Sequence, residues 1–291
     1  HSDVKQQYNH PYWVELRRVK QVIDNYRLSF IELRGIQVAE VCQIFERINQ
    51  AGKPLDIFDI VVAKTFRPQQ NGNSGFYLRE LLDDFRATNN SKFLQIDDFD
   101  YLQVIAIIIR ENIPNSGISN ITPTYLNNIK TEQIEAIWEE TKRAILKTFD
   151  FFENTLHIKG PQLIPYRYFY LTIASYFYKN KRPDYDFLKK YFWFYSFHNS
   201  DLLSNTSHIK THLSFLSKQK NNEEYVFDRF LIDKDILRNS SYSSKGRLSR
   251  AILSLFSSNN PKDWKYTDRS VICDNFFFST DQPNLHHVFP T

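Results

Sequence analysis

The chain has 291 residues, of which 42% are hydrophobic and 24% are charged, and its formal net charge at pH 7 is +4. These values describe a globular protein with a large core, as one long domain or two smaller ones, and exclude an intrinsically disordered chain. No apolar run reaches the ~20 residues that span a bilayer. The two cysteines, Cys42 and Cys273, are too few for a disulfide framework, so a reducing compartment, the cytoplasm, is expected.

The start of the chain is unusual, because His1-Ser2 is not a natural beginning and methionine is absent throughout. Two explanations are open. Either the sequence is an excised piece that carries a tag remnant, or modified residues were lost when it was written out. No signal-peptide pattern opens the chain.

The first predicted elements are a helix and a strand. Between residues 14 and 26 apolar side chains recur at helical spacing, which predicts an amphipathic helix. Residues 27–34 alternate between apolar and polar, which predicts a short strand. A lone strand is not stable, so it needs a sheet that this chain scarcely supplies, and we expect upstream sequence to provide one.

Residues 41–66 predict a helix, a tight turn and a second helix. Gly52 can end the first helix with a left-handed backbone, and Pro54 blocks its continuation. Asp56 can cap the second helix, and Asp59 falls in its first turn, where the helix dipole favours a carboxylate. The expected buried face of this second helix holds Ile57, Phe58, Ile60, Val61 and Ala63.

The middle of the chain is predicted to be helical. Residues 68–75 are dense in turn formers and predict a loop, and residues 77–85 predict a helix. Residues 97–110 contain an almost wholly apolar run that would suit a buried strand, but the flanking helices favour a central core helix.

Residues 131–152 predict a long amphipathic helix with a charged outer face. Its neighbouring carboxylates Glu139 and Glu140 point apart and are not expected to act as an acid–base pair. The expected inner face holds Ile134, Ile137, Trp138, Thr141, Ile145, Leu146, Phe149 and Phe152.

Two aromatic-rich helices follow, over residues 163–178 and 184–198. Aromatic side chains beside Lys189 and Lys190 could stack on flipped or single-stranded bases, but an aromatic stripe at helical spacing favours a core. The more C-terminal cations could face phosphates or simply be solvated, namely Lys218 to Lys220, Arg238, Lys245, Arg247 and Arg250.

Two further helices are predicted near the C-terminus, over residues 228–237 and 248–256. The second is expected to turn Leu248, Ile252, Leu255 and Phe256 inward. Close to the end stand His286 and His287, which on spacing alone are weak evidence for a metal site, because a ligand set needs more converging groups.

Three stretches together resemble GmrSD-type restriction endonucleases, which are bacterial anti-phage proteins that act on modified DNA. The first is Phe45-Glu-Arg-Ile-Asn-Gln-Ala-Gly-Lys-Pro-Leu followed by Phe58-Asp-Ile, which is similar to the segment that closes the N-terminal domain of that family. The second is the pair of aromatic helices, which resembles the family's helical middle. The third is His286-His-Val-Phe-Pro, which resembles the entry to its HNH nuclease domain.

The resemblance implies a mainly α chain, a multi-helical bundle with at most one or two short strands near the N-terminus and at the C-terminal end. It implies three parts: residues 1–70 as the C-terminal part of a ParB/sulfiredoxin-like domain, residues 76–262 as a helical middle domain, and residues 263–291 as the truncated start of an HNH nuclease domain. The family's Asp-Gly-Gln-Gln-Arg motif is absent, so the nucleotide-handling activity proposed for the N-terminal domain, with its nucleoside triphosphate, is assigned to no residue here.

The resemblance also implies site residues. His286 would ligate a divalent cation, Mg²⁺ or Mn²⁺, and His287 would act as the general base that takes a proton from the attacking water. An HNH site also needs a downstream Asn and a second His or Asn, but the sequence stops at Thr291. We therefore expect the parent protein to be an endonuclease and this chain alone to bind metal poorly and not to cut DNA.

The expected function is that of a helical region that links a nucleotide-handling sensor domain to a metal-dependent HNH phosphodiesterase, with modified DNA as the partner and no membrane contact. The alternative is a helical protein–protein interaction or scaffold module without catalytic activity. The sequence indicates neither the oligomeric state nor the DNA modification recognised.

Overall fold

The computed structural model describes residues 10–27, 44, 56–69, 74–112, 121–198, 208–218, 234–241, 243 and 246–270. The chain divides into two compact units, residues 1–47 and residues 48–291. The described residues are mainly helical, as expected, and their only strand pairing is two isolated antiparallel bridges, Arg67 with Phe76 and Lys262 with Ser270. Among these residues no helix combines the length and the apolar character that a membrane crossing requires. The predicted domain boundaries at residues 70/76 and 262/263 stay predictions.

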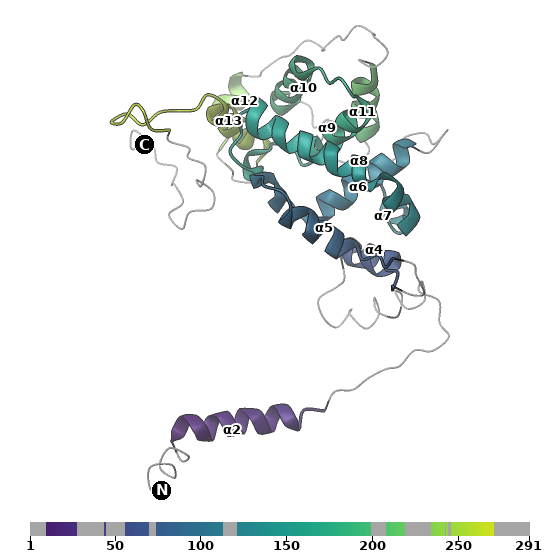
Figure 1. Ribbon diagram of the computed structural model, residues 1–291. Helices are drawn as coiled ribbons and strands as arrows, with labels where there is room; N and C mark the ends of the chain where they lie inside the picture. The colour runs from purple at the N-terminus through teal and green to yellow at the C-terminus, as the bar shows by residue number, and fades with distance from the viewer. Residues whose placement is uncertain are drawn as a thin grey trace. The chain divides into compact units, whose positions relative to one another are not determined.

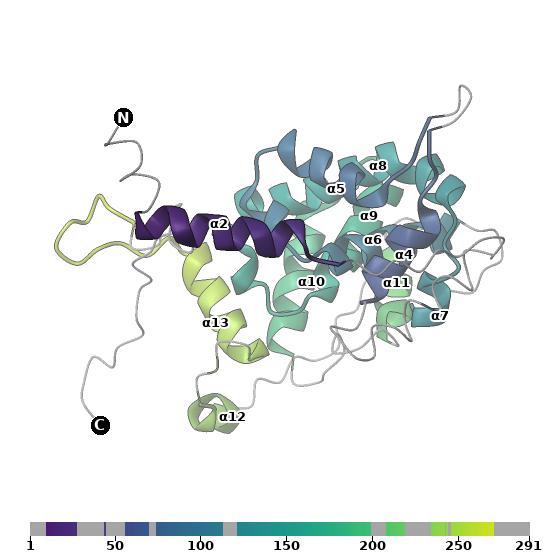
Figure 2. The same ribbon diagram turned by 90° about the horizontal axis from the view of Figure 1, so that it is seen from below.

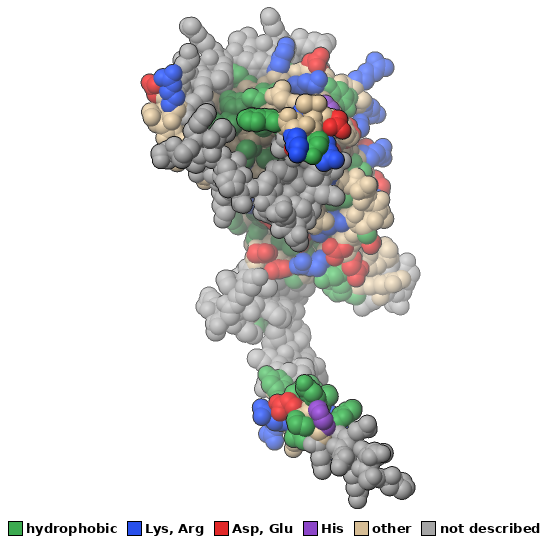
Figure 3. All heavy atoms as spheres, turned by 90° about the vertical axis from the view of Figure 1, so that its left-hand side faces the viewer, with side chains coloured by type: hydrophobic (Ala, Val, Ile, Leu, Met, Phe, Trp, Pro, Cys, Tyr) green, Lys and Arg blue, Asp and Glu red, His purple; other side chains and the backbone are tan. Residues whose placement is uncertain are grey.

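In the first unit the structure describes helix α2 (Pro11–Asp24), which confirms the helix predicted near residues 14–26. His10 caps it, because its Nδ1 accepts a hydrogen bond from the Tyr12 amide at 3.3 Å, and a proline occupies the first turn, where no intrahelical donor is lost. No residue of α2 is buried, and its hydrophobic side chains are visible on the lowest coloured segment in Figure 3. The strand predicted at residues 27–34 lies outside the described residues, apart from Arg27.

Helix α4 (Ile57–Thr65) begins as predicted. The carboxylate of Asp56 accepts a hydrogen bond from the Asp59 amide at 2.8 Å. Phe58, Val61, Val62 and Thr65 are buried at helical spacing, together with Ile60. The expectation that Ala63 is buried is wrong, because it lies two residues from Val61 and therefore on the far side of the helix. Of the preceding predicted helix only Ile44 is described, as helical.

The second unit contains the remaining helices, most of which pack into one bundle (Figure 1). They are α5 (Leu78–Ala87), α6 (Asp98–Asn112), α7 (Pro123–Leu126), α8 (Thr131–Asp150), α9 (Tyr168–Lys179), α10 (Tyr185–Phe197), α11 (Ile209–Lys218), α12 (Lys234–Asn239) and α13 (Arg247–Ser258), with short 3₁₀ turns at Lys92–Gln95 and Pro161–Leu163. Every residue from Asp100 to Ile109 of α6 is buried, and α6 packs against α4, α8 and α9. This confirms the central core helix and excludes the buried strand.

Aromatic side chains fill the space between α8, α9 and α10. Helix α8 continues into a π-helical turn, η2 (Phe151–Thr155), and both Phe151 and Phe152 are fully buried. The rings of Phe169 and Phe192 lie 4.6 Å apart between centroids, which joins α9 to α10. Tyr191 and Phe192 are fully buried, so the core interpretation of this aromatic stripe is confirmed at these two positions.

Helix α13 packs through a different face from the one predicted. Ala251, Ser254 and Ser257 are buried, whereas Ile252 and Leu255 are each 44% exposed and Phe256 is 60% exposed. Leu248 is only half-buried. The small side chains let the helix backbone approach the loop before α9, where the Ser254 hydroxyl donates to the Leu163 carbonyl and the Ser257 hydroxyl donates to the His157 carbonyl at 3.1 Å. The spacing of the apolar residues predicted that the apolar face of α13 would be buried. The hydrogen bonds to the loop carbonyls instead bury the opposite face.

Replacement of Ser254 tests this packing. We expect Ser254→Leu to lower the free energy of unfolding by about 2 kcal/mol or more, because the larger side chain overpacks a fully buried position and leaves the Leu163 carbonyl without its donor. The neighbouring exposed substitution Leu255→Ala is the control, with an expected change below about 0.5 kcal/mol. Urea denaturation measures both, and a larger loss for Leu255→Ala would reverse the assignment of the buried face.

Candidate functional site

The two residues that the sequence singles out for chemistry, His286 and His287, lie outside the described residues. Their assigned roles, metal ligand and general base, therefore stay predictions. Among the residues that the structure describes, no group of three or more His, Cys, Asp or Glu side chains is arranged to hold a metal ion.

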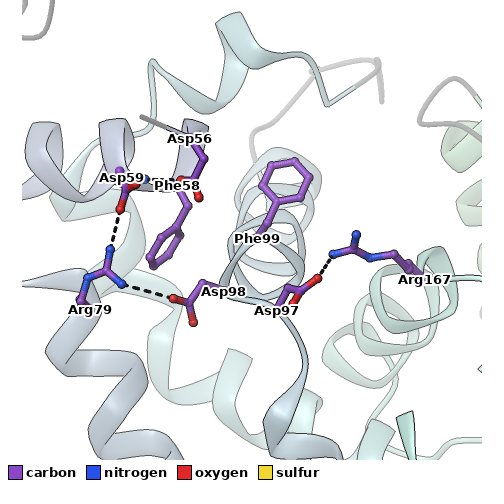
Figure 4. Close-up of a pocket in the computed structure, with 8 residues that line it drawn as sticks. All are labelled: Asp56, Phe58, Asp59, Arg79, Asp97, Asp98, Phe99 and Arg167. Atoms are coloured by element: carbon purple, nitrogen blue, oxygen red, sulfur yellow. Dashed lines mark hydrogen bonds and ion pairs between the residues drawn. The ribbon is translucent and has the colours of Figure 1, made fainter. Parts of the chain in front are cut away.

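Charged side chains cluster at a pocket of about 330 Å³ between the N-terminal ends of α4 and α6 (Figure 4). Helix α5 and the turn before α9 complete its wall. The lining residues are Asp56, Phe58, Asp59, Arg79, Asp97, Asp98, Phe99 and Arg167.

The aspartates gather here because two helices begin here. Asp56 caps α4, and Asp59 lies in the first turn of that helix. Asp98 and Asp100 lie in the first turn of α6, and the Asp97 carbonyl accepts the Asp100 amide at 2.9 Å. Carboxylates are favourable at both helix starts because the unpaired amides and the helix dipole present positive charge there.

Arginines from other elements bind these carboxylates, as Figure 4 shows for Arg79 between Asp59 and Asp98. Arg79 Nη2 lies 2.6 Å from Asp59 Oδ1, and its Nη1 lies 3.5 Å from Asp98 Oδ2. Arg86, about two helical turns further along α5, also forms an ion pair with Asp98. Because Arg79 of α5 pairs with Asp59 of α4 and with Asp98 of α6, these three helices are joined at one point.

A second ion-pair group joins α6 to the start of α9. Arg167 Nη2 lies 2.8 Å from Asp97 Oδ2, and its Nε lies 2.9 Å from Asp100 Oδ1. The Asp100 side chain is 5% exposed, so its ionised form loses solvation, and this burial raises the pKa of the Asp100 carboxyl while the Arg167 guanidinium opposes the rise. Burial likewise raises the pKa of Tyr170 well above its ordinary value.

The charge balance limits what this pocket can do. Four aspartates and two arginines line it, a net charge of −2, which disfavours the phosphates of nucleic acid. Each lining carboxylate is already engaged, Asp56 by a backbone amide and the other three by arginines. A general base held in this way would have to break an ion pair before it could accept a proton. We therefore interpret the pocket as an ion-pair junction that positions α4, and not as a catalytic centre.

The sequence predicted the helix cap at Asp56 but not the junction, because the arginines come from distant positions. Nothing in the spacing of Arg79, Arg86 or Arg167 indicates a common target. Among the cations for which phosphate contact and simple solvation were both open, Arg247 donates to the carbonyls of Ser196 and His198, the latter at 2.8 Å, and so holds the end of α10.

Comparisons of the chain with protein-family models, with curated proteins and with solved structures find no match. The resemblance to GmrSD-type endonucleases thus rests on the motifs of the sequence itself.

The first test of the junction removes its shared cation. We expect Arg79→Met to lower the free energy of unfolding by about 1 kcal/mol, because Asp59 and Asp98 lose their common partner while the side chain keeps its length. The pairs are partly exposed, so the loss should shrink in high salt. The same substitution at Arg143, whose pair with Glu140 is exposed, is the control and should cost less than about 0.5 kcal/mol. Equal losses in urea denaturation would contradict a special role for Arg79.

The second test uses pH. The pKa of Asp100 is raised above its ordinary value of 3.8 in the folded state, so the folded chain holds this proton more tightly than the unfolded chain does. The contribution of Asp100 to stability is therefore full at low pH and is lost as the pH rises through the raised pKa. We expect the free energy of unfolding of the native chain, minus that of Asp100→Asn, to fall over the pH interval that begins near the ordinary value of 3.8 and extends upward. A difference that rises over this interval in urea denaturation would contradict the assignment.

Proposed function

We propose that the chain is part of a DNA endonuclease of the anti-phage restriction type, in which the helical region links an N-terminal nucleotide-handling domain to a metal-dependent HNH phosphodiesterase domain. The observation that carries this proposal is the order of the motifs. The segment that begins at Phe45 precedes the helical bundle, and His286-His-Val-Phe-Pro follows it.

The ion-pair junction supports a linking role for the bundle. Phe58 and Asp59 belong to the first motif, and both line the junction. Asp59 is tied through Arg79 to α6, and α6 is tied through Arg167 to the start of α9. A displacement of α4 would strain these pairs directly. A rigid path of this kind is what a region between a sensor domain and a nuclease domain requires.

The chemistry in this proposal follows the resemblance. His286 would hold Mg²⁺ or Mn²⁺, and a bound cation would stabilise the charge that builds on the scissile phosphate. His287 would take the proton from the water that attacks phosphorus, a task that suits a side chain whose ordinary pKa lies near neutral pH.

A second candidate function is a helical interaction or scaffold module. The observation that favours it is the surface of α2, where Trp13, Leu16 and Ile23 are each more than half exposed and no residue is buried. A helix with an unpaired apolar stripe is typical of a segment that packs against a partner.

DNA binding separates the two candidates. We expect the chain to bind a labelled DNA duplex that carries modified bases, with an affinity that falls roughly tenfold or more between about 50 and 200 mM salt, because bound phosphates release counterions. Fluorescence anisotropy measures this affinity, with the unmodified duplex in parallel. Absence of DNA binding at low salt, together with a stable oligomer in sedimentation, would favour the scaffold module.

The same samples test the assigned histidines. Weak Mn²⁺ uptake, followed by electron paramagnetic resonance, should be lost in His286→Ala and kept in His10→Ala, whose histidine is exposed and precedes α2 as its N-cap. Any Mn²⁺-dependent nicking of plasmid DNA should vanish in His287→Ala. Uptake that is unaffected by His286→Ala would contradict the metal assignment.

A further inference from the structure

The chain after α13 forms a closed loop, residues 259–270, which we name the Trp264 loop. Lys262 and Ser270 form an antiparallel bridge at its base, and the Asp263 amide donates to the Arg269 carbonyl at 3.0 Å. The Ser270 hydroxyl donates to the Asn260 side chain at 2.6 Å. In Figure 1 and Figure 2 this olive to yellow segment projects from the end of α13 away from the bundle helices.

The tip of the loop is also held by hydrogen bonds. The Asp263 carboxylate accepts the amides of Lys265 and Tyr266 at 2.7 and 2.9 Å, which closes a turn around Trp264. These donors stabilise the ionised carboxylate and lower the pKa of Asp263. The Arg269 amide donates to the Tyr266 carbonyl at 2.9 Å. The backbone that carries Trp264 is thus fixed by contacts within the loop.

This fixed turn presents Trp264 to solvent. Its side chain is 91% exposed, the largest exposed fraction among the large hydrophobic residues that the structure describes. An indole in solvent gains no stabilisation from the hydrophobic effect, so burial does not explain why the folded chain holds Trp264 in this arrangement. A large, rigid ring held open by a hydrogen-bonded turn is suited to stack on a planar ligand.

The loop that carries the indole also carries three cations. Lys262, Lys265 and Arg269 are exposed, and the Arg269 guanidinium carbon lies 4.6 Å from the centre of the Tyr266 ring. Lys265 Nζ lies 5.3 Å from the same ring. With Asp263 and Asp268 the loop carries a net charge of +1, and the Asp263 carboxylate is already occupied by backbone amides. Aromatic rings interleaved with cations match a ligand that combines planar bases and phosphates.

The neighbours of Trp264 distinguish this ligand from other partners. A protein hot spot is normally enclosed by a rim of contacts that excludes water, whereas Asp263, Lys265, Thr267 and Asp268 beside the indole are polar. A membrane surface would require more apolar side chains for insertion and fewer carboxylates.

We propose that the Trp264 loop binds an unpaired base of DNA, in a single strand or displaced from a duplex, by stacking with the indole while the cations of the loop contact the flanking phosphates. This proposal rests on the proposed function, since it names the form of DNA that the endonuclease contacts. It adds a binding site that lies outside the three stretches that carry the resemblance.

Single-strand binding in the presence of EDTA tests the loop without any metal chemistry. The probe is a fluorescein-labelled oligothymidine of about 12 nucleotides, within the length that one such site covers, and anisotropy is measured at low salt. We expect Trp264→Ala to weaken binding by roughly tenfold or more, because the stacked base loses its platform. Trp264→Phe should retain most of the affinity, because it keeps an aromatic face.

Two control variants keep the result specific. Trp13→Ala removes another exposed tryptophan, and Phe256→Ala removes an exposed ring from the neighbouring helix α13. Both should bind the oligonucleotide as the native chain does. Since Trp264 makes no buried contact, circular dichroism of Trp264→Ala should match that of the native chain, so a loss of affinity cannot be attributed to misfolding.

The outcomes separate this proposal from the function on which it rests. The loop assignment is overturned if Trp264→Ala binds the oligonucleotide with unchanged affinity, or if the native chain does not bind it at all. If Trp264→Ala still binds the duplex, the endonuclease proposal stands. A third outcome is that single-strand binding depends on Trp264 while Mn²⁺ uptake does not depend on His286. This outcome supports the proposed base-binding loop and contradicts the proposed nuclease site. Trp264-dependent binding to phosphatidylserine vesicles, without single-strand binding, assigns the loop to a membrane and overturns the proposal.

Discussion

Burial of residues 100–109 of α6 is the constraint on which the rest of the second unit depends. Every side chain from Asp100 to Ile109 is removed from solvent, so this helix has no wet face and must be enclosed. Helices α4, α8 and α9 provide that enclosure. Burial also extends to a carboxylate, Asp100, whose ionised form is costly in this position unless a cation meets it. The contact with Arg167 is therefore a consequence of how deeply α6 lies.

The ion-pair junction connects α6 to two of the elements that pack around it, α4 and the start of α9. Arg79 joins the start of α4 to the start of α6, and Arg167 joins α6 to the start of α9. Its net negative charge and its engaged carboxylates separate it from any phosphate-binding or catalytic role. If the first motif closes a sensor domain, as the resemblance implies, the junction is the place where movement of that domain would reach the bundle. The Trp264 loop lies near the C-terminal end of the described residues and carries a net positive charge.

The Trp264 loop and the α13 face illustrate two limits of periodicity. Residues 259–270 contain no repeating apolar pattern, so the sequence indicated only that the helix ends there, and the exposure of Trp264 became visible once the turn closed on Asp263. On α13 the pattern was clear but selected the wrong face. The small residues Ala251, Ser254 and Ser257 made the closer approach, and the hydroxyls found carbonyl partners about ninety to one hundred positions away in the chain.

By itself the sequence determined the helical class, the central position of residues 101–109, the cap at Asp56 and the burial of Tyr191 and Phe192, because each follows from local spacing or capping chemistry. It also carries the motifs on which the proposed nuclease function rests. Only the tertiary structure decided which face of α13 is buried, which arginines meet the aspartates of α4 and α6, and how Trp264 is presented. These features depend on contacts between residues far apart in the chain, and no local pattern encodes which distant partner a side chain will meet.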